Sequence, residues 1–251
     1  MADITVRNQG EVEDSGKVNW RGDQQTVPNE QSIYKSSAVQ LADLGARKVV
    51  GDRVFRYAKC LTGLGAGELG EAKMTLLEAT GGGTDAAGGK TFSFYGAAAI
   101  AKDTYAEGYL NVVTEGNMYR IKNNDAVSSA GNGTFYLYDP LQTLEDITAE
   151  YSIVQNPYLA VEQCTTGAAT VAIGVAPIDV TTGDYFWLQT WGPANMKCGE
   201  AAKGDMIVAD VTGQCIAFDN SSAGVEIPIL GHTLMDVTAS QYGFVFVQIA
   251  P

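Results

Sequence analysis

From residue 33 to the C-terminus, short runs of β-branched and aromatic residues alternate with turns rich in Gly, Asp and Asn. A spacing of about ten residues between such runs is typical of antiparallel sandwiches and barrels, because their strands are short and joined by tight turns. In one run, Val54 and Arg56 would face one side of a strand, and Phe55 and Tyr57 the other. The sequence therefore predicts an all-β fold, a β-sandwich or barrel-like domain or domains, preceded by an extended N-terminal arm.

The expected strands share this composition and are bounded by turn residues. They are 49–57 with a turn at Gly51-Asp52, 91–95, 108–114, 117–122, 134–138, 186–191, 206–211, 216–218 and 244–249. Residues 80–90 (TGGGTDAAGGK) are expected to form a flexible, exposed tip. Residues 139–155 fit both helical and strand spacing, and we expect a turn or short helix followed by a strand.

A motif occurs twice in the C-terminal third of the chain. The segment Asp179-Val180-Thr181-Thr182-Gly183-Asp184-Tyr185 matches Asp236-Val237-Thr238-Ala239-Ser240-Gln241-Tyr242, which lies 57 positions later. Ile173-Gly174 matches Leu230-Gly231 at the same offset. Each copy is followed by an aromatic-rich run that we expect to be a buried strand. The repeat predicts a structural duplication within one β-domain, with a duplicated ligand site as the alternative.

Composition divides the chain into three regions: an arm at 1–32, a β-rich region at 33–160, and a β-rich region with the repeat at 161–251. The arm is polar and holds too few apolar residues to form its own core. It is either a disordered tail or an arm that orders against a partner, and Trp20 favours the second. The candidate partner-binding residues are its large apolar side chains: Ile4, Val6, Val12, Val18 and Trp20.

The charge balance limits the classes of partner. The chain has 16 basic and 29 acidic residues, a formal net charge of -13, which repels phosphate groups. We therefore expect binding to neither nucleic acid nor membrane. No apolar run approaches the roughly 20 residues that span a bilayer, and no signal-peptide pattern is present, so we expect synthesis in the cytosol.

The residues that usually carry chemistry are sparse. Cys60, Cys164, Cys198 and Cys215 lack the paired spacing of zinc sites, and the default expectation is four reduced, packed thiols, although a disulfide between two of them stays open. The single histidine, His232, excludes most triad and zinc-hydrolase arrangements and is expected to be a surface or partly buried structural residue.

Other motifs are weaker still. The acidic residues Glu11, Glu13, Asp14, Glu145 and Asp146 are expected as solvated loop charges. A phosphate loop ending in Gly89-Lys90-Thr91 would need glycine at position 84, which is Thr84. Trp187 and Trp191 would lie on one face of a strand and pack in the core. The sequence thus predicts no enzyme, cofactor or metal site.

Several segments resemble the head decoration (cement) proteins of tailed bacteriophages. They are Ile33-Tyr34-Lys35, Leu44-Gly45, Gly51-Asp52-Arg53-Val54-Phe55-Arg56-Tyr57-Ala58, Tyr138-Asp139-Pro140-Leu141, Gln155-Asn156-Pro157-Tyr158 and Tyr185-Phe186-Trp187-Leu188-Gln189-Thr190-Trp191-Gly192-Pro193-Ala194. The resemblance implies a virion structural protein, often trimeric, that binds the major capsid protein on the outside of an assembled capsid and stabilises it. The alternative is a β-rich tail module or a receptor- or glycan-binding module of a virion.

Overall fold

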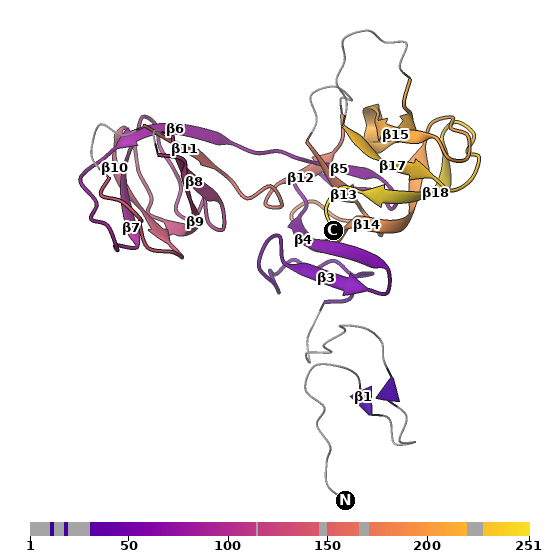
Figure 1. Ribbon diagram of the computed structural model, residues 1–251, viewed down its shortest axis with the longest axis horizontal. Coiled ribbons are helices and arrows are strands. Elements are labelled where there is room, and N and C mark those ends of the chain that lie inside the picture. The colour runs from indigo at the N-terminus through magenta and orange to yellow at the C-terminus, as the bar shows by residue number, and fades with distance from the viewer. Residues whose placement is uncertain are drawn as a thin grey trace, which may run out of the picture. The chain divides into compact units, whose positions relative to one another are not determined.

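The computed structural model describes residues 11–12, 18–19, 31–113, 115–145, 150–165, 171–219 and 228–251. These residues confirm the all-β prediction, and the one helical element among them is the 3-10 turn η1 (Val211–Gly213). The chain forms two compact units (Figure 1). Unit 1 comprises Met1–Lys73 and Ala160–Pro251, and unit 2 comprises Met74–Leu159.

This division differs from the three regions drawn from composition. The predicted region 33–160 contains the end of the first segment of unit 1 and the whole of unit 2, which is inserted between two strands of unit 1. Those strands, β5 (Leu69–Ala72) and β12 (Val161–Gln163), pair antiparallel, with Ala72 opposite Val161. The Nζ of Lys73 lies 2.9 Å from Glu162 Oε1, so the insertion begins and ends at one paired edge.

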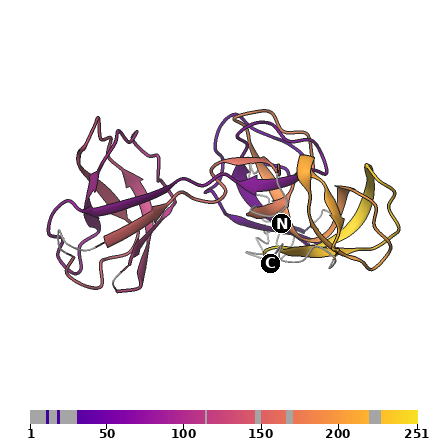
Figure 2. The ribbon, with the colours of Figure 1, turned by 90° about the horizontal axis from the view of Figure 1, so that it is seen from above.

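Unit 2 is a closed barrel of six antiparallel strands (Figure 2). In chain order they are β6 (Leu76–Gly81), β7 (Thr91–Gly96), β8 (Tyr109–Val112), β9 (Asn117–Asn124), β10 (Gly131–Leu137) and β11 (Glu150–Val154). Their order around the barrel is β10-β7-β6-β11-β8-β9. Buried aromatic rings fill the interior, with centroids 4.2 Å apart for both Phe92–Tyr151 and Phe94–Phe135. Four predicted strands, at 91–95, 108–114, 117–122 and 134–138, are thereby confirmed.

Two loops of the barrel can be compared with the sequence predictions. Most of residues 80–90 are exposed, as expected, but Asp85 is buried and its carboxylate accepts hydrogen bonds from the N–H and hydroxyl of Ser93. In the segment 139–155 the strand is confirmed as β11. The described residues 139–145 form bends and the isolated bridge of Glu145 with Asp85 instead of a helix.

Unit 1 is built on one long central strand, β14 (Tyr185–Cys198). The others are β1 (Glu11–Val12), β2 (Val18–Asn19), β3 (Arg47–Val50), β4 (Arg53–Lys59), β5, β12, β13 (Ala172–Val175), β15 (Met206–Ala209), β16 (Cys215–Ala217), β17 (Ile229–Thr233) and β18 (Gln241–Gln248). The strands β1 and β2 pair only with each other, and the remaining ten form a single sheet. The first half of β14 pairs with β4 and β13, and the second half with β18 and β16.

These pairings close two successive rings of strands that share β14. Ring 1 runs β4-β14-β13-β5-β12 and is closed by a parallel bridge between Cys60 and Val161. Ring 2 runs β14-β18-β17-β15-β16 and is closed by a parallel pair, Cys198 with Cys215. Since the two rings have the same connectivity, the duplication predicted from the 57-residue repeat is present and extends beyond the repeated motif.

The turns of the two rings match as well. In ring 1 the isolated bridge Leu64↔Val180 precedes β5 and β14, and in ring 2 the bridge Ala201↔Val237 precedes β15 and β18. The N–H of Ala66 donates to Asp179 Oδ1 over 2.8 Å in ring 1. In ring 2 the N–H of Lys203 donates to Asp236 Oδ1 over 2.7 Å.

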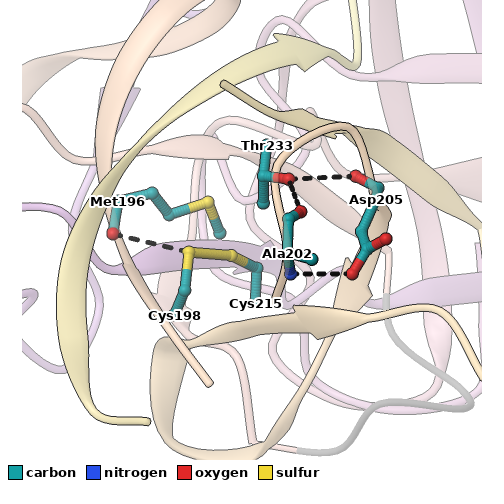
Figure 3. Close-up of a disulfide and its surroundings, with 6 residues drawn as sticks. All are labelled: Met196, Cys198, Ala202, Asp205, Cys215 and Thr233. Carbon is teal, nitrogen blue, oxygen red and sulfur yellow. Dashed lines mark hydrogen bonds between the residues drawn. A yellow bond between two sulfur atoms is a disulfide. The ribbon is translucent and has the colours of Figure 1, made fainter. Parts of the chain in front are cut away.

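The duplicated aspartates therefore join turns that are distant in sequence, which is a structural role. A second carboxylate supports the ring 2 turn (Figure 3): Asp205 accepts from the N–H of Ala202, and the Thr233 hydroxyl donates to the carbonyl of Ala202.

The cysteines depart from the default expectation of four thiols. Cys198 and Cys215 form a disulfide where ring 2 closes (Figure 3). Their Cα atoms are 4.5 Å apart, within the range that a disulfide spans. Cys60 and Cys164 are buried outside the disulfide, and burial raises the pKa of the Cys60 thiol above its ordinary value.

Candidate interaction surface

The described residues contain no group of three or more His, Cys, Asp and Glu side chains that could hold a metal ion. A surface cavity of about 500 Å³ lies on the barrel of unit 2. It is lined by Gly82, Ser93, Asp125, Ala126, Asn132, Gly133 and Thr134. Asp125 is the one ionisable residue of this lining, so the cavity does not offer a pair of groups for acid–base catalysis.

Of the sequence-predicted acidic candidates, the structure describes Glu11 and Glu145. Glu145 was expected to be solvated but is buried, and its carboxylate accepts a hydrogen bond from the Thr143 hydroxyl over 2.8 Å. The main chain of Glu145 also pairs with Asp85, which explains the burial. Glu11 lies in β1, opposite Asn19. Glu13, Asp14 and Asp146 are outside the described residues.

Trp187 and Trp191 do not share a face, contrary to the prediction. The pairing of β14 with β4 shifts register between Gln189 and Trp191, so one extra residue is inserted at a β-bulge. The bulge reverses the alternation. Trp187 packs in the core beside Tyr57, whereas Trp191 is partly exposed and packs edge-on against Phe246 at 5.9 Å.

The outer side of β18 is rich in exposed aromatic residues. Gly243, Val245 and Val247 point inward and are buried, whereas Tyr242 and Phe244 are exposed. The run 244–249 was expected to be a buried strand. This is wrong for its outward residues, since Phe244 has an exposed fraction of 59%.

Neighbouring strands extend this apolar surface. Pro193, Phe246, His232 and Met206 stand opposite one another across β14, β18, β17 and β15. His232 is partly buried, as expected, and stacks on Phe246 with ring centroids 5.5 Å apart. We call this surface the β18 face. It comprises Trp191, Pro193, Met206, His232, Leu234, Tyr242, Phe244 and Phe246. Lys197, which stands opposite Tyr242, forms an ion pair of 3.6 Å with Glu68.

The equivalent surface in ring 1 is covered. Tyr185 and Trp187 occupy the positions that Tyr242 and Phe244 occupy in ring 2, 57 residues later. Trp187 has an exposed fraction of only 4%, because residues 31–50, which we call the cover segment, lie over it. Ile33 of this segment packs in the same cluster as Trp187.

Hydrogen bonds fix the cover segment in place. The Trp187 Nε1–H donates to the carbonyl of Gln31 over 3.0 Å, and the Tyr57 hydroxyl donates to Gln31 Oε1 over 2.7 Å. Burial raises the pKa of Tyr57 above its ordinary value of 10.0. Ser37 and Tyr185 exchange two main-chain hydrogen bonds, of 2.9 and 2.7 Å. The cover segment is therefore bound partly as an added strand residue and partly through side chains.

The candidate partner-binding residues of the arm remain a prediction. Ile4, Val6 and Trp20 lie outside the described residues, and Val12 of β1 is paired with Val18 of β2. The β18 face was missed by sequence reasoning. The available signal was the repeat itself, because its two copies present equivalent aromatic residues, and among the described residues only the first copy is covered by another segment.

Comparison of the chain with protein-family models, with curated proteins and with solved structures finds no match. No helix among the described residues has the length and apolar character needed to cross a membrane.

Proposed function

We propose that this protein is a non-enzymatic virion decoration protein that binds the outside of an assembled phage capsid, through the major capsid protein, and stabilises the shell. The observation that carries the proposal is the β18 face, an uncovered aromatic sheet surface on a chain of net charge -13. Exposed apolar surface of this kind marks interaction sites in otherwise polar proteins. Its aromatic residues are the type that most often dominate binding energy at protein interfaces.

The rest of the molecule suits this role. Net negative charge keeps a protein soluble at high concentration before assembly. Many copies on one shell, proposed here to bind as homotrimers, convert weak individual contacts into stable attachment through avidity.

A second candidate function is a receptor- or glycan-binding module of a virion. The observation that favours it is the polar cavity of unit 2, which Asp125 and Asn132 line. The hydroxyl of the exposed Tyr136 donates to Asp125 Oδ2 over 3.3 Å, which places an aromatic ring beside the cavity. Polar side chains beside an aromatic ring are suited to the hydroxyl groups and apolar faces of sugars.

Co-sedimentation with expanded capsids that lack the protein separates these candidates. We expect saturable binding, weakened at least tenfold by Phe244→Ser and unchanged by Tyr95→Ser, which alters an exposed aromatic residue of unit 2. Analytical ultracentrifugation of the free protein would test the trimer. Absence of capsid binding, together with glycan-array binding that Asp125→Asn abolishes, would replace the decoration proposal with the second candidate.

A further inference from the structure

We infer that the capsid partner occupies the β18 face with an extended polypeptide segment that adds a strand residue beside Tyr242. The inference rests on the proposed function and specifies the partner element that the face accepts. Its basis is the duplication within unit 1: ring 1 shows the equivalent surface already occupied by an extended segment of this chain.

The occupied surface defines the mode of binding. In ring 1 the cover segment pairs its main chain with the first residue of β14, through the two hydrogen bonds between Ser37 and Tyr185. It also places an aliphatic side chain, Ile33, against Trp187. Adding a strand residue at an open edge and filling a neighbouring apolar surface is a general mode of peptide recognition.

The matching edge of ring 2 is open. Tyr242 stands opposite Lys197 on β14, but the Lys197 N–H donates to the carbonyl of Gly67, so this pair does not exchange main-chain hydrogen bonds. The N–H and C=O of Tyr242 therefore point to the other side of β18, beyond the end of β17 at Thr233. No main-chain group in the described part of the chain pairs with them. Tyr185 has the same orientation in ring 1, where Ser37 fills the equivalent place.

The occupant can be described by its chemistry. It offers one main-chain N–H and one C=O to Tyr242, and an aliphatic or aromatic side chain to Phe244. The proposed function sets the β18 face against the outside of the shell, and the net charge of -13 on this chain favours a partner segment that carries basic residues. We therefore assign the segment to the capsid protein.

Photocrosslinking tests the identity and form of the occupant. The full-length protein carrying Phe244→p-benzoylphenylalanine is bound to expanded capsids, irradiated and digested, and the crosslinked peptides are identified by mass spectrometry. The matched control carries the same group at Tyr95, an exposed aromatic position of unit 2. We expect the crosslinks from position 244 to map to one short contiguous segment of the capsid protein.

A pair of substitutions tests the main-chain contact. Tyr242→Ala and Tyr242→Pro both remove the ring, but only proline removes the N–H. Since this N–H has no internal partner, both variants should keep the fold, as measured by circular dichroism. Loss of one hydrogen bond should make the proline variant bind capsids about three- to tenfold more weakly than the alanine variant.

The outcomes distinguish this inference from the proposed function. Failure of the unaltered protein to co-sediment with capsids would remove the proposed function. If it binds but position 244 crosslinks no more than the Tyr95 control, or to several separate capsid segments, the inference is wrong while the function stands. Equal binding by folded alanine and proline variants would also overturn it, as would crosslinks from position 244 to residues 1–30 of a second copy.

Discussion

Truncation of the two equivalent aromatic residues, Trp187 and Phe244, should have very different effects on stability. Trp187 is 4% exposed, and its Nε1–H is hydrogen-bonded to Gln31. Replacing a buried Trp with Ala costs about 3–5 kcal/mol. Phe244 is 59% exposed. Since full burial of a Phe side chain contributes about 1.5–3 kcal/mol, its partial burial contributes about 1 kcal/mol.

We therefore expect Trp187→Ala to lower the free energy of unfolding by at least about 2 kcal/mol more than Phe244→Ala. Urea denaturation followed by far-ultraviolet circular dichroism is the suitable assay, because Trp187→Ala removes one of three tryptophans and would change the fluorescence signal. Equal losses would refute the reasoning, since they would mean that the two surfaces are covered to the same extent in the free protein.

Three further predictions concern the stability of unit 1. Gly231→Ala should lower the free energy of unfolding, measured by urea denaturation, by about 2–5 kcal/mol, because Gly231 has a φ of 151° and a new Cβ would strike the carbonyl of Phe246. The control Gly204→Ala, where φ is 89° and the space beside the Cα is open, should lower it by about 1–2 kcal/mol; similar losses for both variants would contradict the packing around Gly231. Replacing both Cys198 and Cys215 with Ser should lower stability by about 3 kcal/mol, as expected for a separation of 17 residues, and equal melting temperatures with and without reductant would argue against the disulfide. Burial raises the folded-state pKa of Tyr57 above 10.0, so the contribution of its neutral hydroxyl to folding stability is complete below pH 10 and is lost as pH rises through the folded-state pKa. Above pH 10 the melting temperature should therefore fall less steeply for Tyr57→Phe than for the unaltered protein, and parallel curves would contradict this.

Local sequence patterns were sufficient for the strands and for the duplication. The alternation in Val54–Tyr57 and the repeated Asp-Val-Thr segments depend on neighbouring residues, so they could be recognised without knowledge of distant contacts. Insertion of unit 2 could not be recognised, because both units have the same strand-and-turn rhythm. Its boundaries depend on the pairing of β5 with β12, which joins residues far apart in the sequence.

The β18 face could not be recognised from the sequence for a related physical reason. The run 244–249 is apolar at nearly every position, which is typical of a strand buried on both faces. Whether the outward residues are covered depends on a third segment, and ring 2 has no described equivalent of the cover segment. Likewise, the one-residue bulge before Trp191 reversed the face of that side chain, and the long-range pair with Asp85 buried Glu145.

The most direct test of the proposed cementing role is the thermal disruption of expanded capsids, measured by light scattering and electron microscopy with and without saturating protein. We expect the bound protein to raise the disruption temperature, and Phe244→Ser at the same concentration to abolish most of that increase. An unchanged disruption temperature at demonstrated saturation would contradict the claim that this protein stabilises the shell.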